Sequence, residues 1–380
     1  MSGIEDSVVA PLLERLVACD STNPDLVPGG AGEAGVAAIV AAELEAAGFE
    51  VELKDVLPGR PKVVGRLPGT GGGRSLLFCS HTDVVAAGPE GFQPRIEDGR
   101  MLGRGVNDMK GGLAASLVAA RRIAEGGPLA GDLIVAGVID EEYKSAGAIA
   151  LAEAISPDAA ILPEQSNLEL ITAHGGFAWF ELVSHGVESA GIEPDTGIDS
   201  ISLLGPVLDG IAALDRELAG REPAAYGRPS VHASTISGGS QYPAYPERTT
   251  LGIERCLVPG ETWSGAKAEI EAMMAAAQGA DERFRADLEM IVGRNPVELD
   301  EDEPIIEALA LATSERLGRP AVRRGDMGWM DSGILAEAGV PCVVFGPTGT
   351  LEHTPDEWVD IASLDLCAEI LEATARKFCG

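Results

Sequence analysis

The sequence lacks the long apolar runs that membrane insertion or secretion would require. No stretch of the 380 residues approaches about 18 consecutive apolar residues, the length of a membrane-spanning helix. The N-terminal segment MSGIEDSVVAPLLERL has no basic region ahead of an apolar one, so it does not predict a signal peptide. Six cysteines occur without CxxC spacing, at positions 19, 79, 256, 342, 367 and 379. They do not indicate a disulfide framework, and we expect a cytoplasmic protein in a reducing compartment.

Positive charge is also scarce. The chain has 28 lysines and arginines against 60 aspartates and glutamates, which gives a formal net charge of −32. Because a chain of this charge repels polyanions, we expect neither nucleic acid nor an anionic membrane as a partner. A solvated acidic surface accounts for most of these carboxylates, and some of them are available as metal ligands.

The elements that the chain does contain follow two patterns. Up to about residue 175, helical segments such as EAGVAAIVAAELEAAG alternate with apolar strand-like runs such as SLLFCS and DLIVAGVID. The same pattern returns after about residue 292. We expect an α/β catalytic domain over residues 1–175 and 293–380, with a mixed, largely parallel sheet flanked by helices.

Residues 176–292 have a different character. GGFAWFELVSHG, HASTISGG and TTLGIERCLV are typical of antiparallel strands, and two helical segments lie between and after them. This predicts a smaller α+β domain with an antiparallel sheet, which interrupts the first domain.

Polar side chains that suit metal binding follow the strand-like runs of the first domain. They are His81 and Asp83, Asp108, the run Asp140, Glu141 and Glu142, then Glu164, and His353. Any one of these acids would be explained as an exposed surface charge. Because ligand sites gather beyond the carboxyl ends of strands in such sheets, a shared site explains all of them better.

The pair His81 and Asp83 has a specific geometry. On a strand, residues two apart share a face, so the Asp83 carboxylate can hold one ring nitrogen while the other binds a metal. The alternative is a core histidine satisfied by a neighbouring acid. Nitrogen and oxygen ligands of this mix favour zinc, cobalt or manganese over calcium or magnesium. One bridging carboxylate would allow two ions, and a spare carboxylate would serve as general base.

These motifs together resemble one known family. SHTDVV, GRGVNDMKGG, DEEYKSAG, a Glu after an apolar run, and GPTGTLEHTPDEW are similar, in order and over nearly the whole chain, to the di-zinc amidohydrolases and peptidases. That family includes acetylornithine deacetylase, succinyl-diaminopimelate desuccinylase, aminoacylase and glutamate carboxypeptidase. The resemblance implies two divalent ions per chain, zinc with cobalt or manganese as alternatives. It also implies a cis peptide bond between Asp108 and Met109.

The resemblance assigns roles to individual residues. It implies that one ion is bound by His81, Asp108 and Glu164, and the other by Asp108, Glu142 and His353. Asp108 would then bridge the ions, Asp83 would orient His81, and Glu141 would be the general base acting on a bridging hydroxide. Residues 176–292 correspond to the family's lid domain, which also dimerises, so the resemblance implies a homodimer through this domain.

The lid departs from the family pattern. Ala190 stands where the family has an oxyanion-stabilising histidine, and Pro243 where it has an asparagine. The lid arginine that grips the substrate carboxylate falls on Arg255, or on Cys256 if the register slips by one residue. Gln165 and Ser166 also replace a Pro-Thr pair that is frequent in the family.

Other residues offer compensation for the missing lid groups. His232, Tyr242 and Tyr245 are candidate substrate-binding residues, although an ordinary strand histidine explains His232 equally well. Gly346 in GPTG is a candidate to present its backbone N–H to the substrate, and a plain tight turn explains it equally well.

Three functional hypotheses follow. The first is a hydrolase that cleaves the amide bond of an N-acyl amino acid or small peptide. The second keeps the two metals, but the changed lid handles an unusual substrate of a specialised biosynthetic pathway, including a non-hydrolytic outcome. The third is a catalytically dead relative that serves as a binding protein. The complete set of predicted ligands with Glu141 argues against the third, and Ala190 argues for the second.

Overall fold

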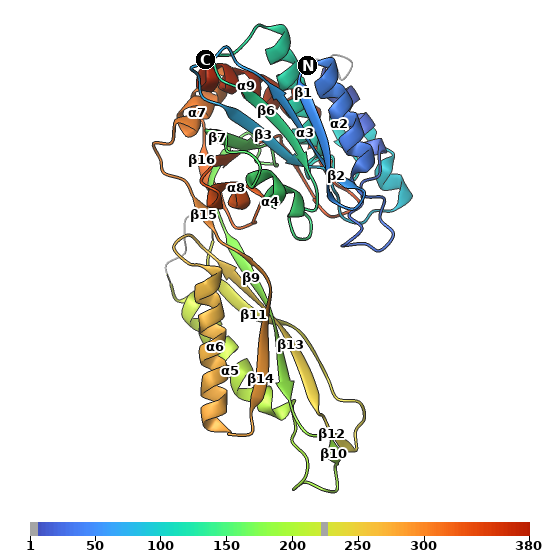
Figure 1. Ribbon diagram of the computed structural model, residues 1–380, viewed down its shortest axis with the longest axis vertical. Helices are drawn as coiled ribbons and strands as arrows, with labels where there is room; N and C mark the ends of the chain where they lie inside the picture. Colours follow the sequence, from blue (N-terminus) through green and yellow to red (C-terminus); the bar gives the residue numbers. More distant parts are fainter. Residues whose placement is uncertain (1–6, 222–226) are drawn as a thin grey trace. The chain divides into compact units, whose positions relative to one another are not determined.

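The computed structural model describes residues 7–221 and 227–380; residues 1–6 and 222–226, at the start of the first predicted domain and inside the second, lie outside them. The chain divides into two compact units (Figure 1). The first unit runs to Thr172 and resumes with Leu299–Arg324 and Met330–Gly380. The second unit contains Ala173–Glu298 and Gly325–Trp329. The predicted class is confirmed: a mixed α/β fold is interrupted by a smaller α+β fold.

The first unit is built on one mixed sheet. In spatial order its strands are β1 (Glu50–Leu57), β2 (Arg60–Leu67), β6 (Leu133–Val138), β3 (Leu76–His81), β7 (Ala159–Leu162), β17 (Cys342–Val344) and β8 (Leu170–His174). The central strands β6, β3, β7 and β17 are parallel, and the flanking pairs are antiparallel. Every residue of β3 and β6 is buried, which explains why their sequences are continuously apolar.

Helices cover both faces of this sheet. The larger layer contains α1 (Ala10–Ala18), α2 (Ala34–Ala46), α3 (Lys110–Glu125), α7 (Pro304–Leu317) and α9 (Ile361–Cys379), and its apolar side chains form the main core. The shorter helices α4 (Ala146–Ala152) and α8 (Ser332–Glu337) lie on the other face (Figure 1). Gly112 lets α3 approach β7 closely, because a Cβ atom there would collide with the carbonyl oxygen of Pro163.

A small second sheet stands beside the main one. Its strands are β18 (Gly349–Thr350), β19 (Trp358–Asp360), β5 (Arg100–Leu102) and β4 (Arg95–Glu97), in that order, and the short helix η2 (Pro89–Phe92) precedes β4. The pairing of β5 with β19 brings two segments together that are far apart in sequence. As a result, the loop after β5 and the loop before β19 are neighbours.

The second unit is a four-stranded antiparallel sheet with two helices on one face. The sheet order is β11 (Ser230–Gly238), β13 (Arg248–Leu257), β9 (Gly176–His185) and β14 (Arg285–Arg294). Alternate residues of β9 and β13 pack against α5 (Gly205–Ala219) and α6 (Trp263–Ala280). The remaining elements are β10 (Ser189–Ala190) paired with β12 (Ala244–Tyr245) and the short helix η3 (Ser202–Leu204). The short strands β15 (Val297–Glu298) and β16 (Arg323–Asp326) both pair with β8 and so belong to the main sheet.

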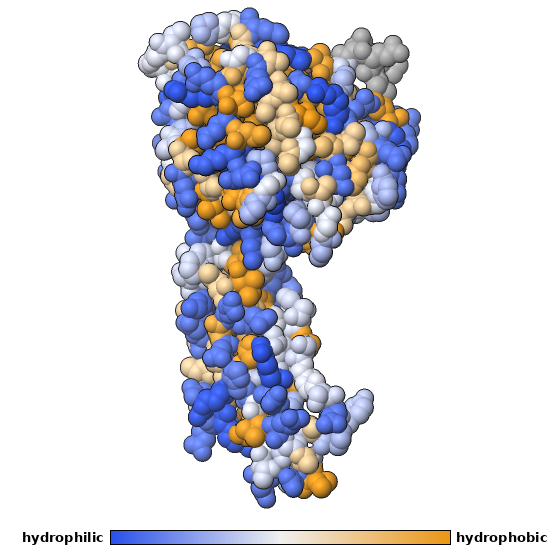
Figure 2. Space-filling view, turned by 45° about the vertical axis from the view of Figure 1, so that its right-hand side comes forward, coloured by the Kyte–Doolittle hydropathy of each residue, from blue (hydrophilic) through white to orange (hydrophobic). Residues whose placement is uncertain are grey.

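None of the helices within residues 7–221 and 227–380 combines the length and the apolar character that crossing a bilayer requires. On the side drawn in Figure 2, hydrophilic and hydrophobic residues are interspersed over both units.

Candidate metal centre

Three parallel strands deliver the candidate ligands to one edge of the main sheet. His81 is the last residue of β3, Glu142 follows the end of β6, and Glu164 follows the end of β7. Because β3 lies between β6 and β7 and runs parallel to both, the carboxyl ends of all three strands meet. Asp108 enters from the loop before α3.

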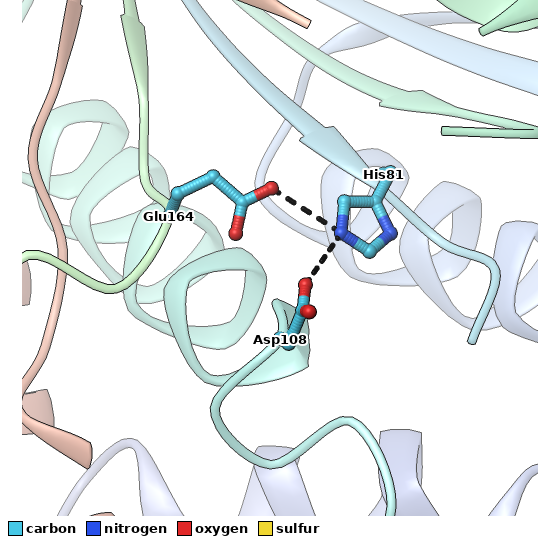
Figure 3. A group of neighbouring side chains, drawn as sticks. All are labelled: His81, Asp108 and Glu164. Atoms are coloured by element: carbon cyan, nitrogen blue, oxygen red, sulfur yellow. Dashed lines mark hydrogen bonds and ion pairs between the residues drawn. The ribbon is translucent and has the colours of Figure 1, made fainter. Parts of the chain in front are cut away.

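The first group of ligands surrounds the Nε2 atom of His81 (Figure 3). This atom lies 3.0 Å from Asp108 Oδ1 and 3.2 Å from Glu164 Oε1. His81 and Glu164 are 1% and 2% exposed, so these contacts are shielded from water. Candidate ligand atoms of the three residues all lie within 4.8 Å of one another.

The second group shares Asp108 with the first. The Nε2 atom of His353 lies 3.1 Å from Asp108 Oδ2 and 3.1 Å from Glu142 Oε2. Each oxygen of the Asp108 carboxylate therefore faces a different histidine, as a bridging ligand requires. The side chain of His353 is 54% exposed, which leaves this side of the centre open to a small molecule.

The hydrogen bond made by Nδ1 of His81 leaves the Nε2 atom available to a cation. The Nδ1 atom lies 3.0 Å from the backbone carbonyl oxygen of Asp83, which can only accept, so Nδ1 carries the proton. In the neutral ring, the lone pair of Nε2 then faces the oxygens of Asp108 and Glu164. Contacts between a lone pair and two carboxylates are repulsive, and a divalent cation among the three groups makes all of them attractive.

The pKa values of His81, Glu164 and His353 are all displaced upward. Burial lowers the pKa of His81, but the charge of Glu164 and the hydrogen bond with Asp108 outweigh it and hold that pKa well above its usual value. Burial raises the pKa of Glu164 to about 7, and the charge of His81 only partly offsets this. Hydrogen bonds with Asp108 and Glu142 raise the pKa of His353 to about 10. Strongly perturbed pKa values gathered in one cluster are typical of functional sites.

Glu141 belongs to neither ligand group in the described chain. Burial raises the pKa of its carboxyl well above the ordinary value, and the charge of His81 opposes this rise. A half-buried carboxyl next to the candidate ligands, with a raised pKa, has the properties of a general base.

Asp83 supports both His81 and the segment that carries Glu141. Its carboxylate Oδ1 lies 3.7 Å from His81 Nδ1, farther than its own carbonyl oxygen at 3.0 Å. The carboxylate instead accepts hydrogen bonds from the backbone N–H groups of Glu141 at 3.1 Å and Glu142 at 3.2 Å. Asp83 is completely buried, so these bonds define the path of the chain after β6.

A buried network behind Asp83 escaped the sequence reasoning. The side-chain amide of Asn23 donates to Asp83 at 2.8 Å and to Asp140 at 3.0 Å. Arg60 donates to Asp140 at 3.3 Å and forms a two-pronged pair with Glu33. The only local signal for Asn23 was its place in the polar segment STNP, between two predicted helices.

The structure also shows what supports Asp108 and Glu164. The peptide bond between Asp108 and Met109 is cis, as the resemblance implies. With its amide oriented to suit both partners, Gln165 donates to Glu164 Oε2 at 3.0 Å and to the carbonyl of Asn107 at 3.1 Å. The Ser166 hydroxyl accepts from Gly346 N–H at 2.9 Å, so in this structure that N–H is engaged within its own unit.

The candidate residues of the second unit make local contacts. Arg255 is 1% exposed and pairs with Glu261 at 2.8 Å and Glu269 at 3.0 Å. His232 is exposed and lies 3.5 Å from Glu254.

Residues of β10 and β12 face each other. Tyr245 pairs across these strands with Ser189, and Ala190 pairs with Ala244. Tyr242 is fully exposed, and it lines a surface hollow together with Pro243.

Comparisons with known proteins show the family to which the chain belongs. The family model described as Peptidase family M20/M25/M40 matches residues 77–377. The chain is 29% identical over 370 residues to N-formyl-4-amino-5-aminomethyl-2-methylpyrimidine deformylase of Bacillus subtilis, covering 87% of this chain and 86% of that protein. It is 27% identical over 353 residues to acetylornithine deacetylase of Myxococcus xanthus, covering 89% and 90%. The family resemblance drawn from the motifs is confirmed.

Solved structures share the fold. The M20 family metallo-carboxypeptidase Sso-CP2 of Sulfolobus solfataricus superposes with a TM-score of 0.80 at 16% identity, covering 98% of this chain and 99% of that one. YXEP of Bacillus subtilis, a dinuclear metal-binding peptidase of the M20 family, has a TM-score of 0.70 at 16% identity, covering 97% and 96%. The first unit and the second unit therefore have counterparts in these proteins.

Proposed function

Because this chain belongs to peptidase family M20/M25/M40, a family of hydrolytic enzymes, we propose that it cleaves the amide bond of a small N-acyl compound. The two curated relatives described above are a deformylase and a deacetylase, which remove a small acyl group from nitrogen. An N-acyl amino acid is the substrate class that we favour, and a small peptide is the neighbouring one.

The observation that carries this proposal is the position of Asp108. Its two carboxylate oxygens lie 3.0 Å and 3.1 Å from the Nε2 atoms of His81 and His353. We assign His81, Asp108 and Glu164 to one divalent ion, and Asp108, Glu142 and His353 to the other. Zinc is the expected metal, with cobalt or manganese as alternatives. Two such ions would polarise the amide carbonyl and acidify the attacking water.

Glu141 then moves the proton. Its carboxylate takes the proton of the attacking water and delivers it to the nitrogen of the leaving amine, so that the acyl group leaves as a carboxylate. Asp83 keeps this glutamate in place through the backbone N–H of Glu141. A base with a raised pKa holds the transferred proton more readily than one with an ordinary pKa.

A cavity beside His353 supports a small substrate. Its volume is about 300 Å³, and small residues line much of it, among them Ala86, Ala87 and Gly103. This volume is at the lower end of the range that is usual for small-ligand pockets. Arg95, Arg104 and Glu90 also line it, and the two arginines pair with Glu97 and Glu357.

The test is amine release by purified protein loaded with zinc, cobalt or manganese. We expect N-formyl and N-acetyl amino acids or amines to be cleaved faster than dipeptides, and the activity to disappear after chelation. Glu125→Gln, on the exposed end of α3, is the control for Glu141→Gln. Metal-loaded protein that releases no amine from any of these compounds would contradict the proposal.

A second candidate rests on Ala190 and Pro243. These residues offer no side-chain donor for an oxyanion, whereas each oxyanion donor is worth about a hundredfold in turnover. A specialised substrate that needs no such donor would explain this difference. Turnover of ordinary N-acyl amino acids at typical enzyme rates would contradict this second candidate.

We also propose a homodimer through the second unit, in a cytoplasmic setting. Strand β11 lies at the edge of its sheet, and its residues from His232 to Gly238 are exposed. An exposed edge strand is a ready surface for pairing with another copy. All six cysteines are unpaired, which suits a reducing compartment. A monomeric mass by light scattering at micromolar concentration would contradict the dimer.

A further inference from the structure

The loop that carries Asp108 is held by one buried side chain from a distant part of the chain. Glu357 is 1% exposed, and its Oε1 atom accepts from the backbone N–H groups of Asn107 at 2.9 Å and Asp108 at 3.1 Å. Its Oε2 atom accepts from the N–H of Gly105 at 3.0 Å and from Arg104 Nη1 at 2.5 Å. Four donors therefore converge on one carboxylate.

Other hydrogen bonds also support this loop, among them that of Arg104 N–H to the carbonyl of Gly91 at 2.8 Å and that of Lys110 N–H to the carbonyl of Gly105 at 2.8 Å. The loop lies between the end of β5 at Leu102 and the start of α3 at Lys110, where the backbone belongs to no strand or helix. Buried N–H groups need acceptors, and here a side chain 249 positions away supplies one to Asp108. The Asn107 side chain also donates a hydrogen bond to the carboxylate of Glu352.

Glu357 also belongs to the segment that carries His353. The two residues are four positions apart in the loop between β18 and β19. Glu357 therefore connects the segment of the shared ligand Asp108 to the segment of the ligand His353. Metal–ligand distances tolerate errors of only about 0.2 Å, so a small displacement of either segment would open the second group of ligands.

We propose that Glu357 is a positioning residue that sets the separation of Asp108 and His353 and so builds the site of the ion bound by Asp108, Glu142 and His353. This inference rests on the proposed metal-dependent function and extends it to a residue outside the ligand set. Glu357 touches neither ligand carboxylate nor imidazole in the contacts described, so its action runs through the backbone of the loop.

Two variants separate this role from a general contribution to folding. Both Glu357→Gln and Arg104→Met break the same buried ion pair. Only Glu357→Gln also leaves backbone donors of the loop without an acceptor, because one amide oxygen cannot serve all four donors and the amide N–H₂ faces donors. Arg104→Met leaves the carboxylate with its three backbone N–H partners.

The measurements are the number of zinc or cobalt ions per chain, the visible spectrum of the cobalt protein, and thermal unfolding of the metal-free protein. We expect wild type and Arg104→Met to bind about two ions with the same cobalt spectrum. We expect Glu357→Gln to bind about one ion tightly, with at least about a tenfold weaker second site and a changed spectrum.

Each other result has a defined meaning. Two tightly bound ions with a wild-type spectrum in Glu357→Gln would overturn the inference, and so would an equal loss in Arg104→Met. A wild-type protein that binds no ion would instead refute the proposed function. If Glu357→Gln does not fold, the double variant Arg104→Met with Glu357→Gln, which leaves no unpaired buried cation, is compared with Arg104→Met by the same criteria.

Discussion

The histidines of the two units make different contacts. In the first unit, His81 and His353 each place Nε2 within 3.2 Å of two carboxylate oxygens. In the second unit, His185 and His232 each lie beside a single acid and are exposed. Each histidine of the second unit faces one acid, whereas His81 and His353 each face two carboxylates, which is an arrangement that a bound divalent cation would suit.

The arginines follow the same division. Arg60 in the first unit is connected through Asn23 and Asp140 to the segment that carries Glu141. Arg255 in the second unit is equally buried, yet its partners Glu261 and Glu269 belong to the same unit and lead to no cluster of candidate ligands. Burial of a charge alone therefore does not mark a functional site. What distinguishes Arg60 from Arg255 is whether its partners connect it to the candidate ligands.

The largest expected effect comes from the shared ligand. Asp108→Asn removes a negative charge from both groups and turns an amide N–H₂ toward one histidine, so we expect both ions to be lost. Amine release should fall by more than about a hundredfold, because the loss of even an outer partner of a metal ligand costs about 10–100-fold. The control His185→Gln, in the second unit, should keep both ions. If Asp108→Asn still binds two ions, Asp108 is not a shared ligand, and the proposed difference between the histidines of the two units is wrong.

The next effect isolates the base. Glu141→Gln keeps the size of the side chain and all five ligands, so the number of bound ions should stay at about two. Turnover should fall by about 10²–10⁴-fold, the usual contribution of a general base. The measurement is kcat at saturating substrate beside metal analysis of the same sample. Loss of metal together with activity would mean that Glu141 is a ligand and that our division of roles is wrong.

A matched pair of arginine variants tests the difference between the two networks. Arg60→Met leaves the buried carboxylate of Glu33 unpaired, and we expect a loss of about 3–5 kcal/mol in the free energy of unfolding. Arg255→Met should cost less, about 1–3 kcal/mol, because Glu261 and Glu269 are partly exposed and can be hydrated. Denaturant titration of the metal-free proteins measures both values.

The same pair has a second readout. Arg60→Met should also weaken metal binding, whereas Arg255→Met should not. If Arg255→Met instead raises KM about tenfold without loss of stability, Arg255 grips the substrate, as its place in the family pattern suggests.

The smallest expected effect is a pH dependence in the second unit. Burial lowers the pKa of His174 below the ordinary 6.5. As the pH falls through 6.5, the unfolded chain binds a proton that the folded chain does not, so the free energy of unfolding decreases until the folded pKa is reached. The slope contributed by this residue is at most about 1.4 kcal/mol per pH unit.

The variant His174→Gln isolates this contribution. We expect the difference in urea midpoint between pH 7.5 and pH 5 to be smaller in the variant than in the wild type. An equal difference would assign the acid sensitivity to other groups.

Some site residues were within reach of sequence reasoning because their chemistry follows local features. His81 ends one apolar strand, Glu142 and Glu164 follow within four residues of two others, and the parallel order of these strands brings their ends together. The burial of Arg255 was also accessible. It lies two residues from Ile253 and from Leu257, and all three side chains are buried on the same face of β13.

The residues that support the ligands were out of reach. Asn23 contacts Asp140 across 117 positions, and Glu357 contacts the Asp108 N–H across 249. Neither contact follows from periodicity or from local motifs, because both join loops that meet only after the sheets have formed.

The amino-acid order alone settled the fold class, the interruption of one domain by another, and the family, since strand periodicity and residue type are local properties of the chain. Folding in three dimensions decided which charges are buried together. It gave Nε2 of His81 two anionic neighbours, gave Arg255 two partners in its own unit, and placed Glu357 under the loop of Asp108. The physical reason is that the energy of a charge depends on its burial and on its neighbours, and both are set by contacts between residues far apart in sequence.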